Sequence, residues 1–142
     1  LIENLVDCRK FGCNFLLNVG PTANGALKGI DKGILEEIGK WIRFNKNFIY
    51  DVKPCDVTAE NADIVKAGDY YYAIIKDVPM AANANVQLGG TVKRVKINAS
   101  VKNAVWLDNG KKADIKRGEF EAIPFNYGTS MHVRVLRFKL KQ

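Results

Sequence analysis

The sequence of 142 residues predicts a mostly β protein, in which an antiparallel β-sandwich follows a shorter helix–strand–helix segment. The hydrophobic period changes near Pro54, because apolar residues recur at helical spacing before it and alternate at strand spacing after it. Turn signals such as Gly89-Gly90 and Asp108-Asn109-Gly110 separate the later apolar runs. An apolar run of strand length, Phe15 to Val19, stops at Gly20-Pro21 and leads through a loop into a helix. That order is typical of a βα unit in a covered parallel sheet.

Two helices are predicted in the first 55 residues. Leu1 to Lys10 has a helical apolar pattern that ends at Phe11-Gly12. A second helix begins near Asp31, an acidic residue suited to a helix N-terminus, and basic residues follow in its last turns. Its apolar positions form one broad stripe, made of Ile30, Ile34, Leu35, Ile38, Trp41 and Ile42.

The segment from Asp51 to Val57 is the predicted linker, since Pro54 ends any regular element and polar residues flank it. We therefore divide the chain into residues 1–55 and residues 56–142. The second part has short alternating runs with turns between them, as in a β-sandwich. The predicted strands lie near Ala62–Lys66, Tyr70–Ile75, Ala84–Leu88, Thr91–Ile97, Ala104–Leu107, Lys112–Lys116, Phe120–Ile123 and Met131–Leu140.

The last predicted strand changes phase along its length. Met131, Val133 and Val135 alternate with polar residues, and then the apolar positions move to the other parity at Leu136, Phe138 and Leu140. A β-bulge, or a twist between two sheets, would have this effect.

The composition is that of an ordinary globular protein with a basic surface. The net charge is +7, from 22 basic and 15 acidic residues. The basic residues alternate with apolar ones along the predicted strands, as in Arg134-Val135 and Phe138-Lys139, which favours the solvated face of a β domain over a nucleic-acid site. A basic oligonucleotide-binding barrel stays open as an alternative, and steep salt dependence would identify it. The sequence has no apolar run near the ~20 residues that a membrane helix needs.

The three cysteines, Cys8, Cys13 and Cys55, do not predict a metal site. Zinc wants four ligands at close spacings, and an odd number of cysteines argues against a disulfide framework. We expect buried thiols, no metal and no cofactor. Asn98-Ala99-Ser100 fits the N-glycosylation pattern, which matters only in a secretory eukaryote.

Several motifs in the first part share one register with a known family. Residues 14–25 read Asn-Phe-Leu-Leu-Asn-Val-Gly-Pro-Thr-Ala-Asn-Gly, and Ile38-Gly39-Lys40-Trp41 and Ile49-Tyr50 follow. From about Leu5 to Pro54 this resembles the end of the catalytic barrel in α-L-fucosidases of glycoside hydrolase family twenty-nine. The helix exit, residues 44–47, lacks the glycine that the family often has at its last position, and Cys55 stands where an aromatic residue is common.

The resemblance implies that residues 1–55 are the end of a (β/α)8-type barrel, comprising a helix, the last strand and the last helix. Residues 56–142 would be the C-terminal β-sandwich domain. The parent protein would remove terminal α-linked L-fucose from glycans with retention of configuration and without a metal. The chain also begins without an initiator methionine, so we expect it to be a piece of something longer, with any targeting segment upstream. Secretion, the periplasm and a lysosome-type compartment all stay open.

A retaining glycosidase needs two carboxylates about 5–5.5 Å apart. In the fucosidases that this chain resembles, both lie on barrel strands upstream of the Asn-Leu-Leu-Leu-Asn motif. The resemblance therefore implies no catalytic residue in this chain, which would be structural and inactive alone. His132, the single histidine, lies in the last predicted strand and is expected at the surface. Glu36 and Glu37 are adjacent on a helix, point apart, and are expected to be solvated.

Asn18 and Trp106 are the candidate substrate-binding residues. Asn18 precedes the Gly-Pro stop of its strand, at the end where barrels of this kind place their active sites. The alternative is an amide that satisfies loop backbone groups. Trp106 with Tyr70-Tyr71-Tyr72 would form a sugar-stacking platform, and the alternative is aromatic residues split between core and surface. A carbohydrate-binding module without hydrolytic activity is thus the alternative function.

The expected partner is a fucosylated glycan, bound through the parent's barrel, rather than nucleic acid or a membrane. The apolar stripe of the second helix has little to cover it within this chain. It is predicted either to pack on the chain's own β region or to drive self-association, because exposed apolar patches of this size mark association.

Overall fold

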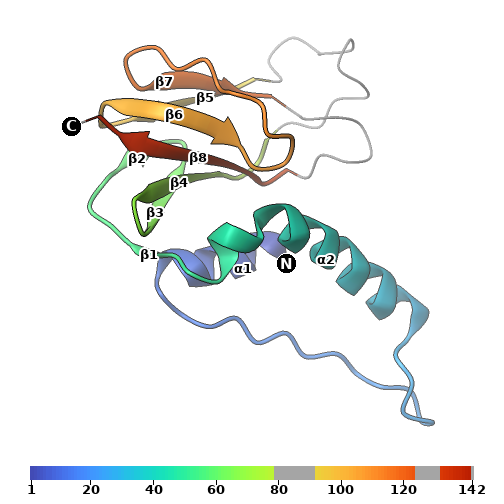
Figure 1. Cartoon of the computed structure of the whole chain (residues 1–142). Coiled ribbons are helices and arrows are strands. Elements are labelled where there is room, and N and C mark those ends of the chain that lie inside the picture. Colours follow the sequence, from blue (N-terminus) through green and yellow to red (C-terminus); the bar gives the residue numbers. More distant parts are fainter. Residues whose placement is uncertain (79–91, 124–131, 142) are drawn as a thin grey trace.

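A computed structural model describes residues 1–78, 92–123 and 132–141. In these residues two helices and two antiparallel sheets form three layers, with the five-stranded sheet between the helices and the three-stranded sheet (Figure 1). The larger sheet has the order β1-β3-β4-β8-β6 and the smaller sheet the order β2-β5-β7. The elements are α1 (Ile2–Lys10), α2 (Gly29–Ile49), β1 (Lys53–Pro54), β2 (Ala59–Glu60), β3 (Asp63–Ala67), β4 (Tyr70–Ile75), β5 (Lys93–Ile97), β6 (Val101–Trp106), β7 (Glu119–Ala122) and β8 (Arg134–Leu140).

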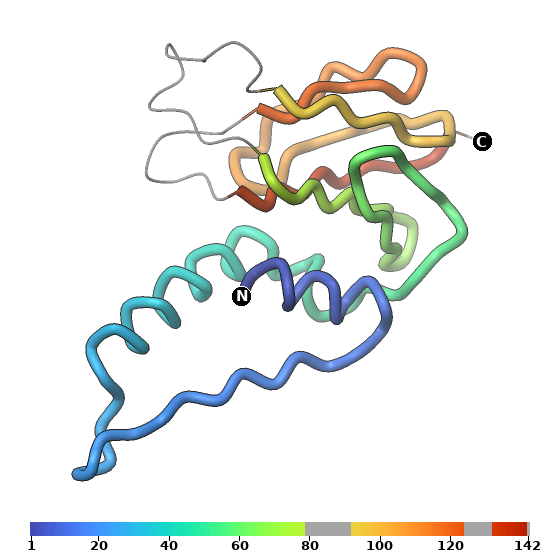
Figure 2. The backbone as a smooth tube through the Cα atoms, turned by 180° about the vertical axis from the view of Figure 1, so that it is seen from behind, coloured from blue at the N-terminus to red at the C-terminus, as the bar shows by residue number. Residues whose placement is uncertain are grey.

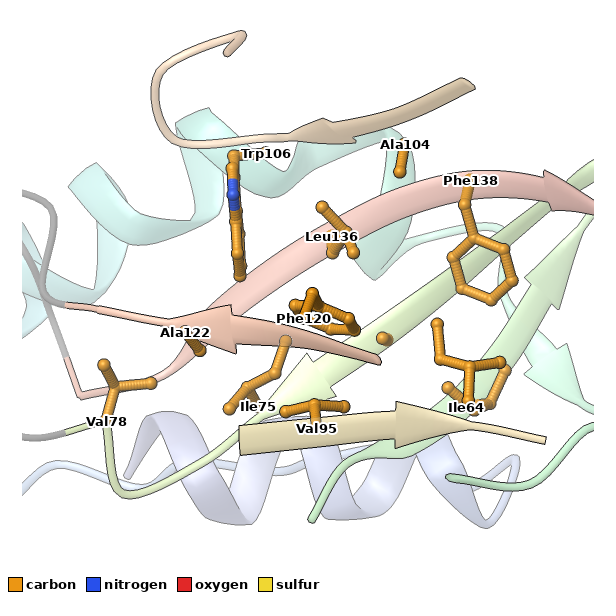
Figure 3. Close-up of a cluster of buried hydrophobic side chains, with 12 residues drawn as sticks. Ile64, Ile75, Val78, Val95, Ala104, Trp106, Phe120, Ala122, Leu136 and Phe138 are labelled. Carbon is orange, nitrogen blue, oxygen red and sulfur yellow. The ribbon is translucent and has the colours of Figure 1, made fainter. Parts of the chain in front are cut away.

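The first core fills the space between the two sheets and confirms the β-sandwich. Its side chains come from alternate positions of the strands, as in β7, where Phe120 and Ala122 are buried and Glu119 and Glu121 are exposed. Figure 3 shows side chains from both sheets converging there. The buried members are Ile64, Ala73, Ile75, Val78, Val95, Ile97, Ala104, Trp106, Phe120, Ala122, Leu136 and Phe138.

The second core lies between the helices and the opposite face of the five-stranded sheet. Phe48 is fully buried and contacts Tyr72 of β4, with 5.6 Å between ring centroids. The indole nitrogen of Trp41 donates a hydrogen bond to the carbonyl of Val133, at 2.9 Å. Both faces of the central strands are therefore covered, which explains the long buried stretch from Tyr72 to Ile75 in β4.

The phase change in the last strand has a different cause from the predicted bulge. β8 pairs with β4 in unbroken register from Tyr71↔Phe138 to Ile75↔Arg134. Val133 and Val135 face the helices, whereas Leu136 and Phe138 face the other sheet. Apolar residues occur on the helix-facing side of the strand only at the end that the helices cover. Beyond that end, only the side that faces the other sheet is apolar. The pairing of β8 with β4 thus has no bulge, whereas the pairing of β6 with β8 has a register shift between Lys102 and Val105. The alternative, a twist between the two sheets, stays a prediction.

The strand predicted over Phe15–Val19 is not formed. Residues 13–28 lie outside any helix or strand and run away from the sheets before returning to α2 (Figure 2). A strand is stable only when a neighbour satisfies its backbone groups, and no described strand of this chain pairs with this segment. The apolar run therefore has the composition of a buried strand but no ladder in this structure.

The other strand predictions fare better. Those over 62–66, 70–75, 91–97, 104–107, 120–123 and 131–140 overlap β3 to β8 within a few residues. Residues 112–116 form only isolated bridges, Val105↔Lys112 and Lys116↔Glu119, and the two-residue strands β1 and β2 were not predicted. The prediction for Ala84–Leu88 lies outside the described residues. Neither described helix is long and apolar enough to cross a bilayer.

The predicted linker is tied to both sides of the chain. Val52 is buried in the second core, and Lys53 and Pro54 pair with Lys66 and Val65 of β3. The guanidinium of Arg9 donates to the carbonyls of Tyr50 and Val52, at 3.4 and 3.2 Å. The division at residue 55 stays a prediction, while the second core includes side chains from before and after it.

Candidate functional site

The segment with the Asn-Phe-Leu-Leu-Asn motif is exposed along most of its length. Asn18 is exposed, and no hydrogen bond to its side chain occurs among the described residues. The turn that follows is locally ordered, because the Thr22 hydroxyl donates to the carbonyl of Ala26 at 2.9 Å and accepts from its amide at 3.1 Å. Gly25 provides the positive φ of 80° that this turn requires. The structure thus leaves Asn18 exposed, and its predicted role in substrate binding stays a prediction.

The first turns of α2, which follow this segment in the sequence, are also exposed to solvent. Ile30 and Ile34 lie on the same helix face as Trp41 and Phe48 but are 72% and 42% exposed. The helix continues past the sheet, so its apolar face loses its cover (Figure 1). Residues 13–34 therefore include both the motif and an exposed apolar helix face.

The aromatic residues of the predicted stacking platform are not brought together. Tyr72 is buried against Phe48, while Tyr71 lies on the opposite face of β4 and stacks on Phe138, at 5.7 Å between centroids. Lys139 and Arg137 lie over the ring of Tyr70, at 4.4 and 4.8 Å from its centroid. The strand alternation splits the three tyrosines, which is the alternative that the sequence left open.

Trp106 is 7% exposed and belongs to the first core. Its ring makes an edge contact with Phe120, at 5.8 Å between centroids. The guanidinium of Arg134 lies over the indole, 3.9 Å from the ring centroid. One face of the ring is therefore occupied by this chain's own cation, which a stacked sugar would have to replace.

Arg134 is a buried residue that the sequence analysis assigned to a solvated face. It is 4% exposed, its Nε and Nη2 donate to both oxygens of Asp108 at 2.5 and 2.9 Å, and its Nη1 donates to the carbonyl of Ile123 at 2.5 Å. A bidentate pair of this kind fixes the turn after β6 against the end of β7. The sequence could have predicted this burial only if Arg134 had been recognised as an inward-facing position of the strand. The phase change made the direction of that position ambiguous.

A groove of about 720 Å³ is lined by residues of both sheets and of the segment between them. The outward charged residues of β5 and β7 line it, together with Lys112, Asp114 and Lys116, and the buried residues Val95, Trp106 and Phe120 also contribute. Its charged lining comprises four basic and four acidic side chains, namely Arg94, Lys96, Lys112, Lys116, Glu60, Asp114, Glu119 and Glu121. Their formal charges cancel, although the whole chain carries +7.

Ion pairs order the charged side chains of this groove. Arg94 and Glu121 occupy opposite positions on β5 and β7 with 3.5 Å between nitrogen and oxygen, and Lys96 and Glu119 repeat this at 3.4 Å. Both pairs are strongly solvent-exposed, so they contribute little to stability. Each pair places a hydrogen-bond donor on β5 opposite an acceptor on β7.

A second charged cluster joins α1 to the five-stranded sheet. The Lys76 ammonium contacts the carboxylates of Asp7 and Asp63, at 2.6 and 3.1 Å, and Lys10 contacts Asp63 at 2.6 Å. Burial alone would raise the pKa of Asp63, but hydrogen bonds from Lys10 and Lys76 outweigh it and lower that pKa. Burial alone would lower the pKa of Lys76, and its hydrogen bonds to Asp7 and Asp63 raise it. A general acid needs a raised carboxyl pKa, and the pKa of Asp63 is shifted in the opposite direction.

The remaining predicted positions lie at the surface. His132 is half-exposed and faces Glu3, with 3.1 Å between Nε2 and Oε1. Glu36 and Glu37 are exposed and face Lys32 and Lys40. Cys8 and Cys55 are half-buried, but Cys13 is exposed, so the prediction of buried thiols is wrong for Cys13. Within the described residues no three His, Cys, Asp or Glu side chains are grouped as metal ligands.

Comparisons with known proteins place this geometry in context. The family model described as "Alpha-L-fucosidase" matches residues 1–47. Human tissue alpha-L-fucosidase is 35% identical over 101 residues, which are 68% of this chain and 22% of that protein. The mouse tissue enzyme is 42% identical over 60 residues, which are 42% of this chain and 13% of that protein.

Solved structures agree over nearly the whole chain. Alpha-L-fucosidase isoenzyme 1 from Paenibacillus thiaminolyticus superposes with a TM-score of 0.74 at 26% identity, over 99% of this chain and 34% of that one. Alpha-fucosidase from Thermotoga maritima shares the fold, with a TM-score of 0.70 at 21% identity, over 96% of this chain and 33% of that one. This chain thus spans about a third of these structures and about a fifth or less of the two curated relatives.

Proposed function

The chain belongs to the alpha-L-fucosidase family, and from that membership we propose that it forms the C-terminal portion of a retaining enzyme that hydrolyses terminal α-linked L-fucose from glycans. The observation that carries this proposal is the family match over residues 1–47, which includes the whole Asn-Phe-Leu-Leu-Asn-Val-Gly-Pro motif. The exposed, unpaired state of residues 13–28 supports it. A segment with the composition of a buried strand that pairs with no described strand fits a strand whose neighbours are supplied by the rest of a barrel.

The role proposed for this chain is structural. Residues 1–55 complete the barrel, and the sandwich supports the last helix from behind through the second core. Trp41 and Phe48 make that support specific, because one hydrogen-bonds to β8 and the other packs on β4. Asn18 would lie at the C-terminal end of the last barrel strand, where its unengaged amide can reach the sugar.

The chain alone is proposed to be inactive. Asp7 and Asp63 both contact Lys76, both oxygens of Asp63 face a lysine, and the pKa of Asp63 is lowered. A retaining reaction requires one carboxyl that donates a proton and one that attacks. This cluster provides neither, so the catalytic pair would come from the rest of the parent protein.

The test compares this 142-residue chain with the parent enzyme on an aryl α-L-fucoside. We expect turnover by the parent and none above buffer by the chain. In the parent, Asn18→Ala should lower kcat/KM by about tenfold or more, since one hydrogen bond to a sugar hydroxyl is lost. Asn14→Ala, an exposed amide at the other end of the same run, is the matched control and should change little. Hydrolysis by the chain alone, or a parent enzyme that does not hydrolyse the aryl α-L-fucoside, would refute the proposal.

A second function, glycan binding by the sandwich without hydrolysis, is favoured by one observation. The groove of about 720 Å³ is lined by charged side chains whose formal charges cancel, within a chain that is basic as a whole.

A further inference from the structure

We infer that the groove across β5 and β7 binds a neutral oligosaccharide through the exposed ion-pair rows of the smaller sheet. The inference rests on the proposed function, because a glycan-processing parent supplies the ligand class. The groove lies within the described residues, and its volume of about 720 Å³ falls within the range of small-molecule sites, roughly 300–1,000 Å³.

The charge balance selects the kind of ligand. A nucleic acid or sulfated glycan gains affinity from an excess of basic residues, through release of counterions. The groove offers no such excess, because its four basic and four acidic side chains cancel. The surplus that gives the chain its +7 therefore lies elsewhere, and the groove favours a ligand without net charge.

The ion pairs supply the hydrogen bonds that such a ligand needs. A hydroxyl group both donates and accepts, so a sugar is matched by a surface on which donors and acceptors alternate. Arg94 and Lys96 donate, and Glu121 and Glu119 accept, from positions directly opposite one another on neighbouring strands. Hydrogen bonds to charged groups are stronger than those between neutral groups.

Trp106 and Phe120 are the aromatic residues of the groove. Figure 3 shows the Trp106 ring pointing from β6 towards Phe120 in the core, and both residues also line the groove. With 7% and 5% exposure they offer an edge to the ligand, not a stacking face. The site thus recognises hydroxyl groups chiefly by polar contacts, and its affinity should be modest, with a dissociation constant of about 1 mM, or roughly −4 kcal/mol.

The test uses the intact chain and two probes, the neutral trisaccharide 2′-fucosyllactose and a heparin-derived oligosaccharide. Titration followed by amide chemical shifts should move residues of β5, β7 and 112–116 with the neutral probe, and heparin should bind this groove more weakly. The double variant Arg94→Ala/Glu121→Ala keeps the net charge and changes only exposed side chains. It should weaken binding of the neutral probe by about tenfold, equivalent to roughly 1.4 kcal/mol.

The matched control is Lys32→Ala/Glu36→Ala, an exposed charge pair on α2 with 4.0 Å between its charged atoms. It should bind the probe as the unmodified chain does. If the double variant fails to fold, Glu121→Gln preserves the side-chain shape and should still weaken binding. No shift at about 20 mM trisaccharide, equal loss in both double variants, or tighter heparin binding in the groove would overturn the inference. A hydrolytically active parent with a groove that binds nothing would overturn it and leave the proposed function intact.

Discussion

The two halves of α2 have the same amphipathic pattern, but the apolar face is buried in one half and exposed in the other. In the C-terminal half, Trp41 is 3% exposed and Phe48 is fully buried, both against the five-stranded sheet. In the N-terminal half, Ile30 and Ile34 on the same face are 72% and 42% exposed. An apolar stripe therefore specifies which face of a helix can be buried. Whether that face is buried depends on a second element that packs against it.

A kink lies within the covered half, at Asn45 between Trp41 and Phe48. Asn45 has non-helical angles (φ −110°, ψ 15°) and is buried, and its amide donates to the carbonyl of Trp41 at 2.8 Å. A side chain that bonds the carbonyl one turn back takes part of the role of the backbone amide. The bend lies within the half that contacts the sheet, where packing can offset its cost.

The largest expected change in the free energy of unfolding comes from a substitution in the buried half of α2, compared with one in its exposed half. Phe48→Ala removes a fully buried ring that contacts Trp41 and Tyr72, and should cost about 3–5 kcal/mol of the free energy of unfolding. Ile30→Ala, on the same face, should cost less than about 0.5 kcal/mol. Urea denaturation followed by circular dichroism measures both. Similar costs for the two substitutions would mean that the N-terminal half is also packed in solution.

A smaller effect is expected at the contact between α1 and the sheet. Lys76→Met leaves the carboxylates of Asp7 and Asp63 without their shared cation, and should lower the free energy of unfolding by about 2 kcal/mol. Lys32→Met, on the exposed side of α2, is the control and should be near neutral. Loss of amide protection should be concentrated in α1.

The same contact gives a pH dependence with a definite sign. The pKa of Asp63 is lowered by Lys10 and Lys76, so its contribution to stability is present above its usual pKa of 3.8 and is lost as the pH falls through the folded-state value. The pKa of Lys76 is raised, so its contribution is present below 10.5 and is lost as the pH rises further. Thermal melts should therefore show an acid loss below about pH 4 that is reduced in Lys76→Met. An unchanged acid limb in the variant would show that other carboxylates cause it.

Limited proteolysis should distinguish the uncovered region from the predicted linker. The first cleavage is expected between residues 13 and 28, where few backbone groups are hydrogen-bonded. Residues 51–57 should be cut later, because β1 pairs with β3 and Arg9 holds the carbonyls of Tyr50 and Val52. Mass spectrometry of the early fragments gives the order. Early cleavage at 51–57 would favour two independent domains.

The smallest effect on stability is expected from Ile30→Ser with Ile34→Ser. The pair should leave the free energy of unfolding within about 0.5 kcal/mol, since neither side chain is covered. It should nevertheless reduce any self-association of the chain, because it removes the exposed end of the apolar stripe. Analytical ultracentrifugation over a range of concentrations measures this. Unchanged association would assign it to another surface.

The sequence alone determined the local elements. Period-two alternation and glycine turns predicted most strands of the sandwich, and the helical stripe predicted α2, because these patterns follow from where side chains point along a single element. The family motif predicted membership of the alpha-L-fucosidase family, by resemblance rather than from side-chain periodicity. Asn18 was predicted from its place before Gly20-Pro21, and the structure leaves it exposed but does not test its contact with a sugar.

Only the tertiary structure decided what each element contacts. Phe15–Val19 has a strand's composition but remains unpaired, because a ladder needs a second strand. Arg134 alternates like a surface residue and yet is buried, because Asp108 and the Ile123 carbonyl meet its guanidinium there. Trp106 is in the core rather than on a platform, because β6 turns it towards Phe120. Burial and pairing belong to two elements at once, and spacing within one element cannot encode them.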